Sequence, residues 1–214
     1  MELIHFLLDF LKDPLTTLQG FLAEYDKLTY AILFLIIFVE TGLIVMPLLP
    51  GDSLLFAVGL LASTTGQLEI SLIIPLLIFA ALLGDNVNYF VGKNFSNFIK
   101  SREKILFLKR EYITQTEAFY EKNGGKAVIL ARFVPIIRTI APFVAGAGSM
   151  KYPRYIVFCI LGAVLWVTSI TLIGYFLGSN EWVKANFEKV VLGIVFVSIL
   201  PMIVGILKAK FSNK

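Results

Sequence analysis

Cysteine and histidine are nearly absent from this chain, since Cys159 and His5 are the single examples in 214 residues. A disulfide needs two cysteines, and a Cys/His zinc site or a Cys–His nucleophilic pair needs several such side chains placed together. We therefore expect no disulfide, no Cys/His zinc site and no Cys–His nucleophilic pair. We also expect no metal, no cofactor and no catalytic residue. Charge is also scarce, at 16% of the residues, and we expect no nucleic-acid partner.

Apolar residues fill the rest of the sequence and occur in long blocks. They make up 57% of the chain, against roughly 45–50% in soluble domains, and the mean hydropathy is +0.83. Several blocks approach the ~20 residues that a helix needs to cross about 30 Å of hydrocarbon. The sequence therefore predicts an all-α polytopic membrane protein. The blocks are 30–49, 54–62, 70–92, 127–147, 155–178 and 190–207.

Loop charges predict the topology. Residues 93–126 carry eight bases and four acids, and bases also dominate 151–154 and the tail 208–214, so these segments belong on the cytoplasmic side. Residues 1–29 hold five acids and two bases, and their apolar residues recur at helical spacing, which predicts an amphipathic helix on the outer surface of the membrane. About three full transmembrane helices are then expected, at 70–92, 155–178 and 190–207.

The two other apolar regions, 30–62 and 127–148, begin and end on the same side of the membrane in this topology. Broken helices at membrane depth are tolerated where protein or water satisfies the freed backbone groups, so we interpret both regions as re-entrant hairpins. Two proline-kinked helices, or for 30–62 a full span followed by a half-helix, stay open as alternatives. The interruptions are Pro47, Pro50 and Gly51 in the first region and Pro135, Pro142, Gly146 and Gly148 in the second.

A short motif recurs in the two halves of the chain. Residues 89–94 (YFVGKN) match residues 175–180 (YFLGSN) at four of six positions, and Pro50 and Pro135 precede them by 39 and 40 residues. Each half is thus a broken hairpin followed by a crossing helix, and the two crossing helices run in opposite directions. Such an inverted repeat is a transporter design. We expect one membrane domain at 30–207, with repeats at about 30–92 and 127–178 joined by an amphipathic surface helix in the linker 93–126.

Four ionisable residues lie inside the broken hairpins: Glu40 and Asp52 in the first, Arg132 and Arg138 in the second. Each such residue costs about 2.5–3.5 kcal/mol on insertion scales, so it usually marks a site or a pathway. If the hairpins meet at their tips, which needs a break at Pro135, the acids and bases can neutralise one another. The arginines also suit phosphate, and an acid in a low-dielectric interior can carry a proton. Purely structural ion pairs are the alternative.

Weaker candidates surround these four residues. Asp85 belongs to a polar cluster, residues 84–88, near the inner end of its helix, where it lines a cavity or makes a polar contact between helices. Pro50, Gly51, Pro135 and Pro142 are expected to shape the hairpins that carry the charges.

The motifs around these residues resemble the DedA family (VTT or SNARE-associated domain) of bacterial inner-membrane proteins. The resemblance covers about residues 25–205, and it implies a lipid transporter that moves undecaprenyl phosphate or a phospholipid such as phosphatidylethanolamine and depends on the proton-motive force. It also implies functional roles for the two acids and two arginines, although many members carry glutamate at position 52. The motifs are Glu40-Thr41-Gly42, Leu49-Pro50-Gly51-Asp52, Gly84-Asp85 with Tyr89 and Gly92, and residues 131–146 with the core Arg132-x-x-Pro135-x-x-Arg138.

Three functional classes compete on these residues. A lipid transporter or flippase is favoured, with membrane lipids bearing an anionic phosphate headgroup, and protons, as its partners. A lipid phosphatase needs histidines at its site, and His5 lies outside the motifs, so we expect no enzyme. A non-transporting scaffold for membrane biogenesis, with structural charges, is the remaining alternative. The expected location is the bacterial plasma membrane with a cytoplasmic C-terminus, and the oligomeric state, including a homo-oligomer, is left open.

Overall fold

The structure, a computed structural model, describes most of the central part of the chain. The described residues are 20, 22, 24, 25, 27–43, 51–94, 104, 105, 108, 109, 120, 124–148, 150–178, 180–186, 189, 190 and 193. Within them the chain forms helices and one pair of two-residue strands, so the prediction of an all-α protein is confirmed apart from that pair. The helices are α3 (Lys27–Gly42), α4 (Gly51–Thr65), α5 (Ile70–Asn94), α8 (Lys126–Ala131), α9 (Pro135–Ala147), α10 (Tyr152–Leu177) and α11 (Glu181–Ala185).

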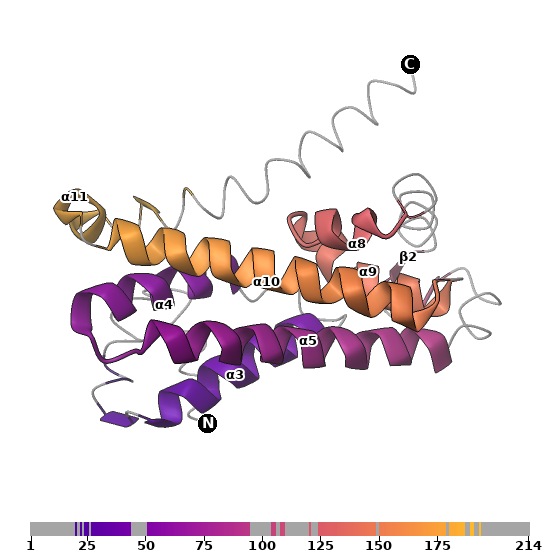
Figure 1. Ribbon diagram of the computed structural model, residues 1–214, viewed down its shortest axis with the longest axis horizontal. Coiled ribbons are helices and arrows are strands. Elements are labelled where there is room, and N and C mark those ends of the chain that lie inside the picture. The colour runs from indigo at the N-terminus through magenta and orange to yellow at the C-terminus, as the bar shows by residue number, and fades with distance from the viewer. Residues whose placement is uncertain are drawn as a thin grey trace, which may run out of the picture.

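Two helices, α5 and α10, form the long axis of the molecule and run antiparallel beside each other (Figure 1). They have 25 and 26 residues. At 1.5 Å per residue each is about 37–39 Å long, enough to cross roughly 30 Å of hydrocarbon. Both match the helices predicted at 70–92 and 155–178. The third predicted span, 190–207, lies outside the described residues except for 190 and 193, as do most of 1–29 and all of 208–214.

The two interrupted regions form pairs of shorter helices. Pro135 begins α9 after an extended Val134 (φ −120°, ψ 106°), because proline disfavours helical conformation at the preceding residue and needs no N–H at a first helical position. The predicted break at Pro135 is therefore present. Pro142 and Gly146 do not interrupt their helix, so that part of the prediction is wrong. The helix continues through both residues to Ala147, at the loss of one backbone hydrogen bond at Pro142.

The shorter helices pack on the long ones in a crossed pattern. In each half the first arm lies on its own long helix, α3 on α5 and α8 on α10, whereas the second arm lies on the other one, α4 on α10 and α9 on α5. Glycines bring the crossed pairs into backbone contact. A side chain at Gly174 would overlap the Phe56 carbonyl group, and one at Gly146 would overlap the Tyr89 carbonyl group. Close backbone approach of this kind is typical of membrane helices and interlocks the two halves.

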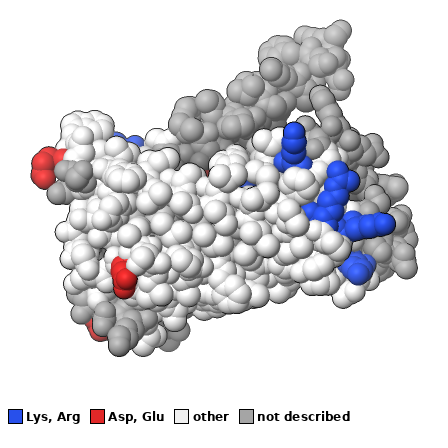
Figure 2. All heavy atoms as spheres, viewed as in Figure 1, with Lys and Arg blue, Asp and Glu red and all other residues white. Residues whose placement is uncertain are grey.

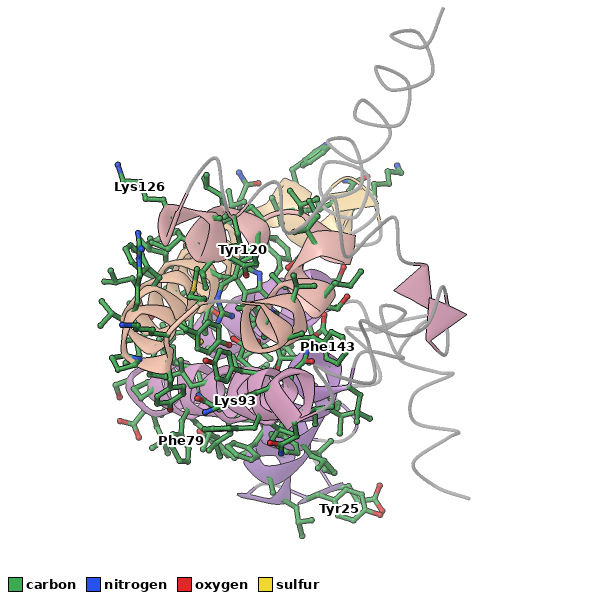
Figure 3. All side chains as sticks on the ribbon, turned by 90° about the vertical axis from the view of Figure 1, so that its right-hand side faces the viewer. Tyr25, Phe79, Lys93, Tyr120, Lys126 and Phe143 are labelled. Atoms are coloured by element: carbon green, nitrogen blue, oxygen red, sulfur yellow. The ribbon has the colours of Figure 1, made fainter. Side chains whose placement is uncertain are left out.

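Between the two ends of the molecule the outer surface of the long helices shows almost no charged side chain (Figure 2), and large apolar side chains are exposed on it. Phe79 on α5 is 55% exposed and Phe176 on α10 is 69% exposed. Figure 3, which views the molecule along its long axis, places Phe79 at the periphery of the helices. An exposed apolar surface of this extent marks a face that contacts lipid or protein, because soluble monomers rarely carry one.

Charged side chains gather at the two ends of the long axis (Figure 2). We call the end where α5 finishes and α10 begins the basic end, and the opposite end the acidic end. The exposed charges at the basic end are Lys93 in the last turn of α5, Lys126 at the start of α8, and Lys151 and Arg154 at the start of α10. Those at the acidic end include Glu69, directly before α5, and Glu181, the first residue of α11.

A pair of strands, β1 (Lys104–Ile105) and β2 (Leu108–Lys109), lies in the segment predicted to be a surface helix. They pair antiparallel, with Lys104 opposite Lys109 and Ile105 opposite Leu108. Two residues separate the strands, which is the spacing of a tight hairpin. The helix prediction for 93–126 is therefore wrong at these four residues, and its first two residues belong to α5.

Candidate functional site

Arg138 lies in the first turn of α9 and is 7% exposed. Its Nη2 atom donates to Glu40 Oε1 at 2.5 Å, and its Nη1 atom donates to Asp52 Oδ1 at 2.8 Å. Glu40 comes from the last turn of α3 and Asp52 from the first turn of α4, so one guanidinium joins the ends of three helices. The structure thus brings together three of the four charged residues singled out in the sequence.

The helix ends explain how the two acids reach this position. Asp52 sits in the first turn of α4, where a carboxylate complements the positive end of the helix dipole. Gly51 lies directly against the Glu40 carboxylate, and any side chain at position 51 would overlap it. Gly51 therefore gives Glu40 the room to reach Arg138. Pro50 lies outside the described residues, and the side chain of Pro135 does as well.

Trp166 of α10 completes this group, which we call the Arg138 cluster (Arg138, Glu40, Asp52 and Trp166). Its Nε1 atom donates to Asp52 Oδ1 at 2.8 Å, and its ring lies under the Arg138 guanidinium, with 4.6 Å from Cζ to the ring centroid. A cation over an indole face contributes about 0.5–2 kcal/mol, more when desolvated. Trp166 therefore holds both members of an ion pair from two other helices.

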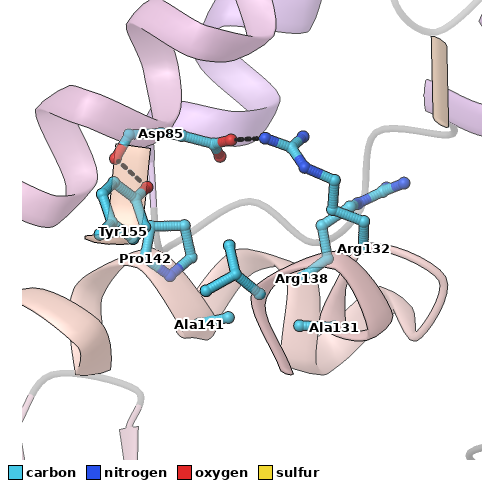
Figure 4. Close-up of a pocket in the computed structure, with 8 residues that line it drawn as sticks. Asp85, Ala131, Arg132, Arg138, Ala141, Pro142 and Tyr155 are labelled. Atoms are coloured by element: carbon cyan, nitrogen blue, oxygen red, sulfur yellow. Dashed lines mark hydrogen bonds and ion pairs between the residues drawn. The ribbon is translucent and has the colours of Figure 1, made fainter. Parts of the chain in front are cut away.

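Arg132 does not join the Arg138 cluster, which corrects the prediction that the four charges neutralise one another. Its Nη2 atom donates instead to Asp85 Oδ2 of α5 and, at 3.3 Å, to the Cys159 carbonyl oxygen of α10. Arg132 directly follows α8, and the extended Val134 separates it from α9. In Figure 4 Arg132 reaches toward Asp85, whereas Arg138 extends away from it. The break that was expected to bring the arginines together points them at different acids.

A small pocket lies beside the Arg132–Asp85 pair (Figure 4). We call the polar residues around this ion pair the Arg132 cluster (Arg132, Asp85, Cys159 and Tyr155). The Tyr155 hydroxyl donates to the Asp85 backbone carbonyl at 3.1 Å, and the Cys159 Sγ atom lies 3.4 Å from Asp85 Oδ2. The lining residues are Asp85, Val128, Ala131, Arg132, Arg138, Ala141, Pro142 and Tyr155.

The two clusters differ in their charge balance. The Arg138 cluster has two carboxylates for one guanidinium, and the Arg132 cluster has one of each. Most of these groups are removed from solvent, with Glu40 1% exposed and Asp85 3% exposed, whereas the Asp52 side chain is 15% exposed. Buried charges need close pairing to offset their desolvation cost. The Arg138 cluster therefore carries one negative charge more than its base can neutralise, which a proton or a cation can balance.

Comparison with known proteins decides the family. The family model of the VTT domain matches residues 49–176 of this chain. Protein DedA of Escherichia coli strain K12 is 47% identical over 211 residues, which cover 98% of this chain and 96% of that protein. The chain belongs to the DedA family of membrane proteins. The resemblance stated from the sequence motifs is thus confirmed.

Other relatives of this DedA-family protein are also named as membrane proteins. An uncharacterized membrane protein of Mycobacterium tuberculosis strain H37Rv is 46% identical over 174 residues, covering 81% of this chain and 76% of the relative. Inner membrane protein YqjA of Escherichia coli strain K12 is 29% identical over 192 residues, covering 86% and 87%. No solved structure matches this chain. The chain is therefore a membrane protein, as its hydropathy predicts.

The VTT match contains the whole Arg132 cluster and all of the Arg138 cluster except Glu40 in this DedA-family protein. Its residues include Asp52, Asp85 and Arg138, whereas Glu40 precedes it. Sequence reasoning singled out neither Trp166 nor Cys159 as a site residue. No sequence signal marks them, because a cysteine and an aromatic residue inside an apolar span are typical of a helix core.

Proposed function

We propose that this DedA-family protein moves a phosphate-bearing lipid across the bacterial inner membrane. Undecaprenyl phosphate and a phospholipid such as phosphatidylethanolamine are the substrates that fit this proposal. The observation that carries it is the fork of Arg138, which holds one carboxylate oxygen on each of its two terminal nitrogens in the interior of a membrane protein. Ionisable residues in such positions usually mark a substrate or ion pathway.

The two carboxylate oxygens on Arg138 stand where two oxygens of a bound phosphate would stand. Guanidinium binds carboxylate and phosphate through the same pair of parallel N–H donors. A lipid phosphate can therefore replace Glu40 and Asp52 on Arg138 without a change in the donor geometry. In this mechanism the acids hold Arg138 while no headgroup is bound, release it to the phosphate, and take it back when the headgroup leaves.

The extra acid of the Arg138 cluster supplies a link to protons. One proton on Glu40, the more deeply buried of the two acids, makes the cluster neutral and turns that carboxyl group from a charged acceptor into a weaker partner for Arg138. Protonation therefore favours the step in which Arg138 is released to a phosphate. We propose that a proton gradient drives lipid movement through this step.

The arrangement of the helices supports a path across the membrane. We propose that α5 and α10 span the bilayer and that the shorter arms enter it from opposite sides, in an inverted repeat. The arms α3, α4 and α9 are about 20–24 Å long at 1.5 Å per residue, shorter than roughly 30 Å of hydrocarbon, and their inner ends meet at Arg138. The basic end then faces the cytoplasm. The protein is multi-pass, with its C-terminus on the cytoplasmic side after a further span at 190–207.

A second candidate function is that of a non-transporting scaffold for membrane biogenesis. The observation in its favour is that Arg138 already has two anionic partners, as a structural ion pair would. Under this hypothesis the clusters hold the arms together and bind no lipid. Neither candidate requires a catalytic residue, and we assign the protein no enzymatic activity.

Transport by the purified protein in liposomes tests the proposal. Fluorescent undecaprenyl phosphate and phosphatidylethanolamine would be followed separately, with and without a pH gradient, for the native chain and for Arg138→Gln and Arg132→Gln. We expect the native chain to move at least one of the two lipids faster in the gradient and both variants to lose that activity. Lys151→Gln, at the exposed basic end, is the matched control for loss of one positive charge.

The outcome separates the two candidates. Native transport that disappears in both arginine variants, with yield and thermal stability near those of Lys151→Gln, supports transport. A native chain that moves neither lipid faster than protein-free liposomes, together with variants that fail to fold, contradicts transport and favours the scaffold.

A further inference from the structure

The buried face of α10 carries a line of residues that touch both clusters. Tyr155, Cys159, Gly162 and Trp166 recur at intervals of three and four residues, so they share one helix face, and all of them are buried. Cys159 contacts Arg132 and Trp166 contacts Arg138. These two contact points are seven residues apart, which is about 10 Å along the helix axis. The Arg132 cluster lies nearer the basic end, because α10 begins there.

Arg132 is held in a way that leaves part of its guanidinium unused. The only anionic contact of Arg132 among the described residues is Asp85, and this contact and the Cys159 contacts use Nη2 alone. Its Nε and Nη1 atoms have no hydrogen-bond partner in the described part of the chain, although the residue is only 4% exposed. A buried donor without a partner is destabilising, and more so when it is charged. These unpaired donors belong to a residue that lines the pocket of Figure 4.

The charged residues that line the pocket favour binding of an anion, because two of them are basic and one is acidic. Arg132 and Arg138 both line it, and Asp85 is the single acid among its lining residues. Gly162 lets the Arg132 side chain cross α10, since a Cβ atom at position 162 would stand 2.9 Å from Arg132 Cδ and Nε. The Arg132 cluster is electrically neutral as it stands, so an incoming anion must displace Asp85 or share Arg132 with it.

We propose that this pocket is a second phosphate-binding site, about two helical turns from the Arg138 cluster toward the basic end, and that Asp85 is its resident counter-ion. This inference rests on the proposed function, and the pocket would be a second headgroup-binding site along the same transport path. A phosphate group there takes the Nε and Nη1 donors of Arg132 that the described residues leave unpaired. Asp85 keeps Arg132 in place when the site is empty. It is a positioning residue rather than a phosphate ligand.

The test uses the purified full-length chain in detergent and measures its thermal midpoint, Tm, against phosphate concentration. Asp85→Asn keeps the shape of the side chain and leaves Arg132 without its anion. Breaking a buried ion pair by removing one partner is strongly destabilising, so we expect Tm to fall by about 6–20 °C. Inorganic phosphate should restore most of that loss by occupying the site. The double variant Asp85→Asn/Arg132→Gln removes both charges and should show no phosphate-specific gain.

Phosphate also stabilises proteins in general through exclusion from their surface, so the gain of the double variant is the baseline to subtract. A second arm replaces inorganic phosphate with dioctanoyl phosphatidic acid, a short-chain lipid phosphate. A larger gain from the lipid than from the free ion assigns the site to a lipid headgroup, and an equal gain assigns it to phosphate as such. Both results support the inference. A gain in Asp85→Asn no larger than that of the double variant overturns it.

Transport by the double variant covers the case in which Asp85→Asn alone does not fold. The double variant should keep its yield and lose at least tenfold in lipid transport, and an unchanged rate overturns the inference. Native transport and the phosphate-specific gain in Tm together distinguish a failure of the proposed function from a failure of the second site. Native transport without any phosphate-specific gain in Asp85→Asn keeps the proposed function and removes the second site. A phosphate-specific gain in the Tm of Asp85→Asn without transport by the native chain keeps the second site and removes the proposed function. The protein would then bind an anion but move no lipid.

Discussion

Replacing Trp166 with phenylalanine isolates one hydrogen bond of the Arg138 cluster. The change removes the Nε1 donor that reaches Asp52 Oδ1 at 2.8 Å and keeps an aromatic ring under the Arg138 guanidinium. A hydrogen bond to a charged group contributes about 1.5–3 kcal/mol. For a chain of this length 1 kcal/mol shifts Tm by about 2–4 °C, so we expect Trp166→Phe to lower Tm by roughly 3–12 °C.

Trp166→Ala should cost more, because it also removes the ring. Large-to-small changes of buried aromatic residues cost about 3–5 kcal/mol, and here the stacking on Arg138 is lost as well. The second tryptophan, Trp182, supplies the matched control. It is 63% exposed on α11, so Trp182→Phe should change stability by no more than about 0.5 kcal/mol.

The assay is thermal unfolding in detergent, with lipid transport in liposomes measured on the same preparations. Trp166→Phe should be less stable than Trp182→Phe and more stable than Trp166→Ala. Equal Tm values for Trp166→Phe and Trp182→Phe would refute the reasoning, because they would mean that the indole donor does not hold Asp52.

Three further changes probe the clusters and the helices around them. Glu40→Gln leaves one acid for Arg138 and should flatten the pH dependence of transport, and an unchanged pH profile in liposomes would count against proton coupling. Gly162→Ala should lower the transport rate strongly and Tm only slightly, because its Cβ atom displaces Arg132. A variant that transports lipid at the native rate would contradict that contact. Asn88→Leu removes the amide that donates to the Thr139 and Thr41 carbonyl oxygens, so it should lower Tm by a few degrees. A variant with the native Tm would show that these hydrogen bonds do not stabilise the fold.

Local rules made much of the helical architecture predictable. Apolar block length predicts α5 and α10, and proline stereochemistry predicts the start of α9 at Pro135. Whether the helix ends at Pro142 was harder to predict. A proline in the second turn or later costs a backbone hydrogen bond, and the helix can still continue through it where tertiary packing holds it in place. The strand pair at 104–109 lies in a segment whose mixture of charged and apolar residues fits a surface helix equally well.

The membership of each charge cluster could not be predicted in the same way. The positions of Arg132 and Arg138 follow from the sequence, but their partners depend on how the arms cross the long helices. Arg132 reaches Asp85 because α8 lies on α10 and α9 lies on α5, and no local pattern contains that crossing. The role of Trp166 could not be predicted for the same reason. A tryptophan inside an apolar span is indistinguishable from a core residue until the structure shows which acceptor its Nε1 atom reaches.

The most direct test of the central claim is undecaprenyl phosphate transport by Arg138→Lys in liposomes under a pH gradient. Lysine keeps the charge but offers no planar fork, so it cannot hold two oxygens in parallel. Loss of one charge-assisted hydrogen bond of about 1.5–3 kcal/mol predicts a rate roughly 10- to 150-fold below that of the native chain, at near-native yield. A variant that transports at the native rate would contradict the claim that the Arg138 fork carries the phosphate.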